Sequence, residues 1–259
     1  MIWINGQFTD NENCLSVFDK LNVGMSVFTT MLAMEKKIIW EQDHINRVFE
    51  HAGVLEIICP YSKSQILESA QKILNEKKYN FSAIRIQISA GIGARGIDYP
   101  ETATVFITCT NSMDPAAAQP VSVKIEEEVR RGEHDPLSRI KSGDYGASAL
   151  CRKKVQSKGF DDVIFLNYQD QVTCASASNI FIQKDGILLT PRLEDGAMNG
   201  MAREKLIEKH GAREQSLSVV DLNAADYIWL TNSFSIRPVK TLNNTERPTQ
   251  RLILTDWLC

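Results

Sequence analysis

The stretch DQVTCASASNIF, residues 170–181, constrains the fold most because it puts small polar side chains between two apolar segments. The flanking segments, Val163–Leu166 and Ile187–Leu189, are short apolar runs typical of buried strands. The residues from Thr173 to Ser178 carry hydroxyl, thiol or methyl groups. Side chains of this size let a backbone approach a partner closely, and hydroxyl groups can hold its polar atoms. We therefore expect a bound group to lie against this run, which has Cys174 in its middle.

Composition and charge limit the class of protein. The chain has 259 residues, of which 43% are hydrophobic and 24% are charged, as in a soluble globular protein of one large or two modest domains. A net charge of -3 and the lack of a basic run argue against nucleic-acid binding. The N-terminal MIWINGQF has no signal-peptide pattern, and no apolar stretch approaches the roughly 18 residues of a membrane span. A cytoplasmic protein with no nucleic-acid or membrane partner is expected.

The six cysteines are scattered and form no CxxC pair. No His/Cys grouping has the spacing of a zinc site, so no metal is expected. Free thiols in a reducing cytoplasm explain the spacing better than disulfides do. The cysteines are residues 14, 59, 109, 151, 174 and 259.

Hydrophobic periodicity predicts a mixture of strands and helices, that is, an α+β protein. Helices are expected from an N-cap at Asp43 to about Ala52, and from Tyr61 or Ser62 to about Lys77. Two further helices are expected over about 147–157 and 200–210, and strands over 2–5, 26–33, 37–40, 83–90, 104–109, 121–129, 163–166, 187–189 and 227–231. The segment MDPAAAQP is the best linker candidate because it has two prolines and no periodicity. The expected domains are 1–112 and 121–259, with the linker at 113–120.

Three short motifs suggest chemistry. In RIKSGDY, Lys141 could form a Schiff base if burial or a nearby cation lowered its pKa, although alone it reads as a surface lysine. The loop EDGAMNGMAR, residues 194–203, leads into a helix whose first N–H groups could bind phosphate, or it is a plain turn. LTNS, residues 230–233, places amide and hydroxyl groups at a strand end, where they also commonly serve as turn formers.

Taken in this order, the motifs resemble the signature of the class IV (fold-type IV) pyridoxal phosphate enzymes. The resemblance runs through Lys141, GFDDVIFLNYQDQVT, SNIF and GILLTPRLEDGAMNGMAR, and extends to WINGQF, VFTT and HINRV. That family includes branched-chain and D-amino acid aminotransferases and 4-amino-4-deoxychorismate lyase. The resemblance implies a two-domain, D-amino acid aminotransferase-like fold with a small N-terminal α/β domain and a larger C-terminal β-barrel-like domain. It also implies pyridoxal 5'-phosphate as cofactor, a small-molecule substrate and a homodimer.

The resemblance assigns roles to matching positions. Lys141 would be the Schiff-base lysine, and Arg47 in HINRV would hold the cofactor phosphate. Tyr145 would donate a hydrogen bond to the phenolic oxygen of the cofactor, or it is an ordinary half-buried aromatic residue. The phosphate would also be bound by the backbone amides of Met201 and Ala202, and by Asn232 or Ser233.

Cys174 departs from the family pattern. After Val-Thr the family usually has glutamate, whose carboxylate pairs with the protonated ring nitrogen and makes the ring a strong electron sink. A neutral thiol cannot supply that charge. Cofactor binding is expected to survive this change, whereas the strength of the electron sink is expected to fall.

The same resemblance favours the lyase, which converts 4-amino-4-deoxychorismate to 4-aminobenzoate and pyruvate in folate biosynthesis. Thr30 would relay a proton to the leaving group, or it is only a β-branched strand residue. Arg95 is a candidate for binding a substrate carboxylate, or it is an exposed loop arginine. The loss of the glutamate also favours elimination, because formation of an aromatic ring helps to drive that reaction. The alternatives are a branched-chain or D-amino acid aminotransferase and a non-catalytic cofactor-binding protein.

Overall fold

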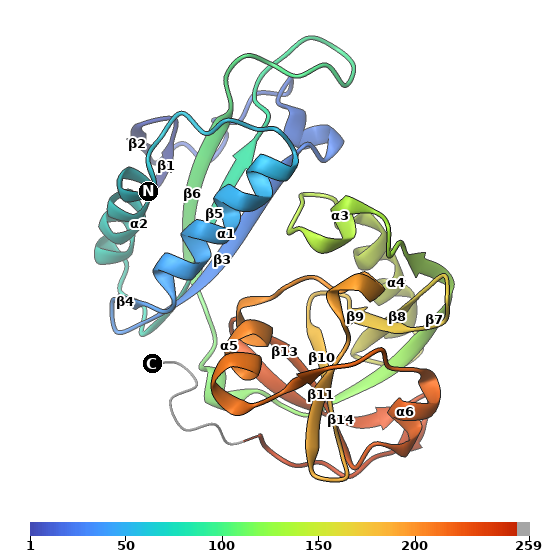
Figure 1. Cartoon of the computed structure of the whole chain (residues 1–259). Helices are drawn as coiled ribbons and strands as arrows, with labels where there is room; N and C mark the ends of the chain where they lie inside the picture. The colour runs from blue at the N-terminus through green and yellow to red at the C-terminus, as the bar shows by residue number, and fades with distance from the viewer. Residues whose placement is uncertain (253–259) are drawn as a thin grey trace. The chain divides into compact units, whose positions relative to one another are not determined.

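The structure of the chain is a computed structural model, and it describes residues 1–252 (Figure 1). Cys259 lies outside the described residues. The chain forms two compact units. Among the described residues, unit 1 contains Met1–Asp114 together with Ile140–Asp144, and unit 2 contains Pro115–Arg139 and residues 145–252. The units are therefore not two continuous stretches, because the segment that carries Lys141 returns to unit 1.

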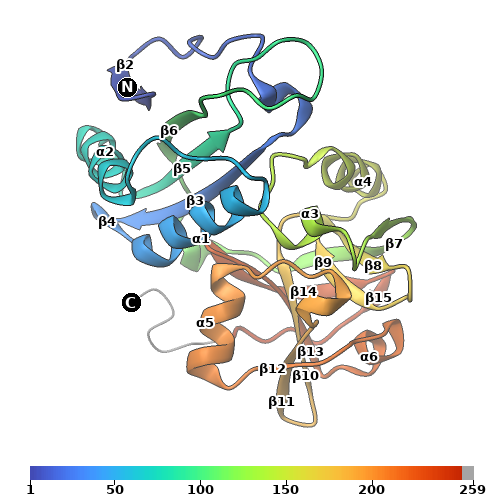
Figure 2. The same cartoon turned by 45° about the horizontal axis from the view of Figure 1, so that its top comes forward.

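Unit 1 is a six-stranded antiparallel sheet with two helices on one face. The strand order is β2-β1-β6-β5-β3-β4, and Figure 2 shows α1 lying along β3 with α2 beside it. The strands are β1 (Ile2–Ile4), β2 (Gln7–Thr9), β3 (Ser26–Met34), β4 (Lys37–Ile38), β5 (Phe81–Ser89) and β6 (Thr104–Asn111); the helices are α1 (Glu41–Val54), α2 (Lys63–Glu76) and the short 3-10 helix η1 (Lys20–Val23).

The helix starts in unit 1 are only partly those predicted. Ser62 caps α2 in a capping box with Gln65, as its sequence position suggested. The expected N-cap at Asp43 is wrong, because α1 already begins at Glu41, after Trp40 in the left-handed conformation. No side chain caps α1. The apolar faces of both helices and the inward side chains of β3, β5 and β6 form one core, which also includes Ile140.

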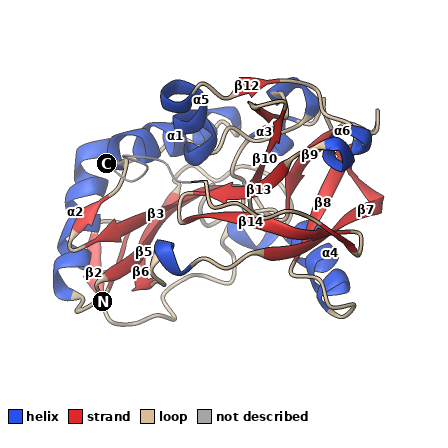
Figure 3. Cartoon of the chain, turned by 90° about the horizontal axis from the view of Figure 1, so that it is seen from below, coloured by secondary structure: helices blue, strands red, loops and turns tan. Residues whose placement is uncertain are grey.

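Unit 2 is built on a nine-stranded mixed sheet that curls. Its path is β12-β11-β10-β13-β14-β7-β8-β9, with β15 paired to β14. Figure 3 shows the strands of this sheet together with α4, α5 and α6. The strands are β7 (Val121–Arg131), β8 (Asp162–Asn167), β9 (Val172–Ala175), β10 (Asn179–Lys184), β11 (Ile187–Thr190), β12 (Arg213–Glu214), β13 (Tyr227–Asn232), β14 (Ser235–Leu242) and β15 (Thr245–Glu246). The helices are α3 (Pro136–Arg139), α4 (Gly146–Gln156), α5 (Met201–His210) and α6 (Val219–Ala224), with 3-10 turns η2 (Pro115–Ala117) and η3 (Leu193–Asp195).

The predicted mixture of helices and strands is confirmed. The small-residue stretch forms β9, a tight turn and the start of β10, so that its end lies in the middle of the sheet. Helix α4 packs on β7 and β8, whereas α5 packs on β13. Among the described residues, no helix is both long and apolar enough to cross a membrane.

Candidate functional site

The candidate residues lie on both units, and each group is described within its own unit. In unit 1, residues 140–144 lie along the edge of β3. The backbone N–H of Phe28 donates to the carbonyl of Lys141 at 2.9 Å, and the N–H of Gly143 donates to the carbonyl of Ser26 at 2.7 Å. A Cβ at Gly143 would lie 2.2 Å from the Ser26 hydroxyl oxygen. Glycine therefore lets this segment approach the strand and hold Lys141 beside it.

The amine of Lys141 lies in a cationic environment. Its Nζ is 4.4 Å from the centre of the Phe28 ring, and the Arg85 guanidinium carbon lies 3.9 Å from the same ring. The residue as a whole is half-buried, but its amine is surrounded by protein. Burial, followed by the charges of Arg47 and Arg85, lowers the pKa of Lys141 to about 7. A large share of the amine is then uncharged and nucleophilic at neutral pH, as a Schiff-base lysine requires.

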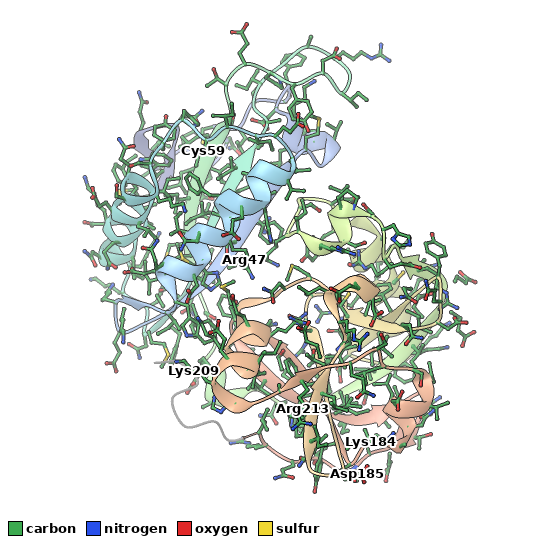
Figure 4. All side chains as sticks on the ribbon, in the orientation of Figure 1. Arg47, Cys59, Lys184, Asp185, Lys209 and Arg213 are labelled. Carbon is green, nitrogen blue, oxygen red and sulfur yellow. The ribbon has the colours of Figure 1, made fainter. Side chains whose placement is uncertain are left out.

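Arg47 is a buried arginine on α1, labelled in Figure 4. Its Nη2 donates to the Thr29 hydroxyl oxygen at 3.0 Å, and that oxygen is 2.7 Å from Nδ1 of His44, one turn earlier on α1. These bonds join the guanidinium to β3. The charge of Arg47 also acts on the amine of Lys141, so these two side chains lie near each other within unit 1.

Thr30 faces away from α1, on the opposite side of β3 from Thr29. It lies directly across from Arg85 in the β3–β5 register and is half-buried. Arg95 is exposed in the loop after β5, and none of the contacts in the described part of the chain joins it to Lys141. By geometry, Arg85 is the better candidate for binding a substrate carboxylate.

In unit 2, the start of α5 has the features of an anion site. Gly200 is the N-cap residue, and no side chain caps the N–H groups of Met201 and Ala202. A Cβ at Gly200 would lie 2.2 Å from Oδ1 of Asn179, so these two residues pack in close contact. The amide of Asn179 also donates to the carbonyl of Met198 at 2.7 Å. Uncapped N–H groups at the positive end of a ten-residue helix favour a bound anion.

The end of β13 lies beside Asn179. Thr231 pairs with Asn179 in the β10–β13 register, and its hydroxyl is buried without a hydrogen-bond partner among residues 1–252. Asn232 serves the turn, since its Oδ1 accepts from the backbone of Phe234 and Ser235. Its amide nitrogen lies 3.4 Å from the hydroxyl of Ser178, and the neighbouring Ser233 is half-buried. An unsatisfied hydroxyl beside an uncapped helix start fits a phosphate group.

Cys174 lies opposite Phe165 in the β8–β9 register and packs against the cluster beneath α4. It is half-buried. Tyr145 is the residue before α4 and is also half-buried. The small-residue run is fastened by buried Asp162, whose Oδ1 accepts from the backbone of Ser176.

Two residues near these groups were not predicted from the sequence, and a third lay in a predicted motif without a role of its own. Arg85 is an isolated arginine in an apolar strand, and Thr231 belongs to the LTNS strand end, where only Asn232 and Ser233 were assigned a role. His51 is the second histidine of α1, and its Nδ1 accepts the backbone N–H of Lys141 at 3.0 Å. Burial, then the charges of Arg47 and Lys141, lowers the pKa of His51 to about 3. The four-residue spacing of Arg47 and His51 was the available signal, because it puts both on one helix face.

Comparison with known proteins identifies the family. Residues 26–242 match the family model described as amino-transferase class IV. The chain therefore belongs to the class IV amino-transferase family. The expected family is confirmed, and pyridoxal phosphate, present in a solved structure of the same fold, is confirmed at the level of the family.

Individual relatives differ in activity. The aminodeoxychorismate lyase of Bacillus subtilis (strain 168) is 29% identical over 248 residues, which cover 90% of this chain and 83% of the lyase. Other relatives are named as branched-chain-amino-acid and D-alanine aminotransferases.

Solved structures confirm the expected fold. A structure from Legionella pneumophila titled "Putative 4-amino-4-deoxychorismate lyase" superposes with a TM-score of 0.88 at 24% identity, covering 94% of this chain and 92% of its own. A "hypothetical aminotransferase" of Mycobacterium tuberculosis, in its PLP-bound form, gives a TM-score of 0.84 at 20% identity, covering 96% and 93%.

Proposed function

We propose that the protein is a pyridoxal phosphate-dependent lyase that converts 4-amino-4-deoxychorismate to 4-aminobenzoate and pyruvate. The observation that carries this proposal is a cysteine, Cys174, in place of a carboxylate in a chain that retains Lys141 with a pKa lowered to about 7. The similarity to the Bacillus subtilis lyase supports it. We further propose that the protein acts in the cytoplasm as a homodimer, which gel filtration with light scattering would test.

We assign one or more residues to each chemical group of pyridoxal phosphate. Lys141 would attach the aldehyde, and Arg47 would bind the phosphate together with the backbone N–H groups of Met201 and Ala202. Among the strand-end residues, Thr231 adds a hydroxyl to the proposed contributions of Asn232 and Ser233. Tyr145 would hydrogen-bond the phenolic oxygen, and Cys174 would face the ring nitrogen.

When bound, pyridoxal phosphate draws electrons from the bonds at the carbon that carries the substrate amine. The uncharged amine of Lys141 is suited to take the proton from that carbon, because its pKa is close to neutral pH. Thr30 would pass a proton to the departing enolpyruvyl group, which leaves as pyruvate. Arg85, which lies across from Thr30 and shares the Phe28 ring with Lys141, would hold a substrate carboxylate; Arg95 remains the second candidate.

A product assay tests the reaction. Protein loaded with pyridoxal phosphate is incubated with 4-amino-4-deoxychorismate, and separately with pairs of branched-chain or D-amino acids and keto acids. We expect 4-aminobenzoate and pyruvate in equal amounts and little keto-acid exchange. Faster transfer of amino groups would instead establish an aminotransferase, and no product in either assay would favour a non-catalytic protein. Thr30→Val should bind the cofactor normally and slow turnover, whereas unchanged turnover would remove Thr30 from the mechanism.

Cys174→Glu tests the role of the cysteine at this position. A carboxylate facing the ring nitrogen should favour its protonation, and each unit of pKa corresponds to about 1.4 kcal/mol. We expect this substitution to raise amino-group transfer more than the lyase reaction. Glutamate is larger than cysteine, so a thermal melt should accompany the assays. A folded, cofactor-bound variant with both activities unaltered would show that Cys174 does not face the ring nitrogen.

A further inference from the structure

His51 makes a direct contact with the backbone of Lys141. The N–H of Lys141 donates to Nδ1 of His51 at 3.0 Å, across 90 residues of sequence. An imidazole nitrogen accepts a hydrogen bond only through its lone pair. His51 must therefore be uncharged, with its one ring proton on Nε2.

The peptide groups on both sides of the Lys141 Cα are held by different elements. The N–H is bound to His51 on α1, and the carbonyl accepts from Phe28 on β3 at 2.9 Å. The preceding residue, Ile140, is buried in the core of unit 1. Without His51, the hydrogen bond that it accepts from the Lys141 backbone would be lost, and this N–H would need another partner.

Helix α1 also carries Arg47. His51 follows it by four residues, which is about 6 Å along the helix axis and on the same face. Arg47 is itself anchored to β3 through Thr29. Helix α1 thus positions two cationic residues. It carries the guanidinium of Arg47 directly, and it holds the backbone of Lys141 through His51.

We propose that His51 is a positioning residue that holds Lys141 at a set distance from Arg47. The proposal rests on the proposed roles of Lys141 and Arg47 toward the aldehyde and the phosphate. Those two groups are carried by one rigid aromatic ring, so the residues that bind them must keep a fixed spacing. Loosening the lysine should weaken the binding of a ligand that engages both residues more than one that engages only Arg47.

The tautomer of His51 tests the contact in the unaltered protein. Nitrogen-15 shifts of the imidazole, measured near pH 7 without cofactor, report which ring nitrogen carries the proton. We expect a neutral ring with the proton on Nε2. A ring protonated on Nδ1, or on both nitrogens, would overturn the proposal, and this measurement needs no variant.

Variants separate positioning from general stability. His51→Asn places an amide oxygen near the position of Nδ1, whereas His51→Leu keeps the bulk and removes the acceptor. In cofactor-free protein, we expect hydrogen exchange of the Lys141 amide to be about tenfold faster in His51→Leu, the effect of one lost neutral hydrogen bond, and close to the original rate in His51→Asn. His44→Leu is the matched control, because it removes a buried histidine of the same helix that bonds to Thr29 instead. Equal exchange rates in His51→Leu and the original protein would contradict the proposal.

Two ligands complete the test. Pyridoxal phosphate has both the aldehyde and the phosphate, and 4-deoxypyridoxine phosphate has the same ring and phosphate without the aldehyde. We expect His51→Leu to bind pyridoxal phosphate about tenfold more weakly and the deoxy compound almost unchanged, with His51→Asn close to the original protein for both. If His51→Leu lost the same amount of affinity for both ligands, His51 would have only a structural role. If the original protein binds neither ligand, the proposed function is wrong. The hydrogen-exchange and tautomer measurements would still show whether His51 accepts the hydrogen bond from the Lys141 backbone.

Discussion

The two groups of candidate residues differ in how they would bind an anionic ligand. The group in unit 1 consists of cationic side chains: Arg85 and Lys141 lie against the Phe28 ring, and the charge of Arg47 acts on Lys141. The group in unit 2 is uncharged and consists of the N–H groups at the start of α5 with the hydroxyl of Thr231. The first depends on charge, and the charges of Arg47 and Arg85 also lower the pKa of Lys141. The second depends on how closely an anion can approach the backbone N–H groups at the start of α5.

This difference determines which substitutions matter. In unit 1, removing a side chain removes the interaction itself. At the start of α5 in unit 2, the interacting atoms belong to the backbone, so there only a change of shape, such as an added Cβ at Gly200, disturbs them. The predictions below test this contrast, from the largest expected effect to the smallest.

Lys141→Ala should have the largest effect. Loss of a positioned general base costs roughly 10²–10⁴ in rate, and the attachment point for the aldehyde disappears as well. Borohydride treatment of the loaded original protein, followed by peptide mass spectrometry, should fix the cofactor on Lys141; the variant should show no labelled peptide. Lys184→Ala, a lysine that pairs with Asp221 in unit 2, is the control. Labelling of another lysine in the original protein would overturn the assignment.

Arg47→Gln should weaken cofactor binding by several-fold to a few hundred-fold, since a charge-assisted hydrogen bond contributes about 1–3 kcal/mol. It should also raise the pKa of Lys141, because the charge of Arg47 helps to lower it. Equilibrium titration measures the first effect, and the pH dependence of reductive methylation of Lys141 in cofactor-free protein measures the second. Arg152→Gln, on α4, should change neither. If Arg47→Gln bound the cofactor more weakly but left the pKa of Lys141 unchanged, the charge of Arg47 would not be a cause of the lowered pKa of Lys141.

The same contrast explains what could be predicted from the sequence. Arg47 and Lys141 were assigned because their motifs resemble those of the class IV family, and the start of α5 was found because a glycine-containing loop leads into a helix. The contacts that tune them were not found. Docking of residues 140–144 onto β3 and the bond from Lys141 to His51 join segments far apart in the sequence, and no periodicity reports such pairings. The start of α1 was also missed, because the β3–β4 hairpin and Trp40 set it without a capping side chain.

Gly200→Ala should impair unit 2 through shape alone. The added methyl would meet Asn179 at 2.2 Å, and relieving such overpacking costs about 1–3 kcal/mol. We expect a lower melting temperature and weaker binding of 4-deoxypyridoxine phosphate. Gly53→Ala in α1 is the matched control, because its Cβ would meet nothing within 4 Å and should stabilise the helix by about 0.5–1 kcal/mol. Unchanged binding in a folded Gly200→Ala protein would exclude the start of α5 as the anion site.

Acid should destabilise unit 1 before unit 2. The folded pKa of His51 is about 3, below its ordinary 6.5, so between these values the unfolded chain binds a proton that the folded chain does not. Stability therefore falls as the pH drops below 6.5, by on the order of 1 kcal/mol per pH unit. In unit 2, hydrogen bonds from Ser218 and Lys184 lower the pKa of Asp221 to about 2 from 3.8, and its contribution is lost only below 3.8. Lys141 adds no dependence here, because its folded and unfolded forms are both charged well below pH 7.

Hydrogen exchange, corrected for its intrinsic pH dependence, would measure this difference in cofactor-free protein. Protection of β3 and β5 should decline between pH 6.5 and 4 while protection of β10 and β13 holds. His51→Asn should remove most of that decline, because asparagine does not titrate and still accepts the hydrogen bond from Lys141. Leu222 in α6 and Ile86 in β5 are both fully buried and serve as matched reporters of the two units. A parallel decline in both units, unaffected by His51→Asn, would show that the acid sensitivity of unit 1 does not come from its buried histidine.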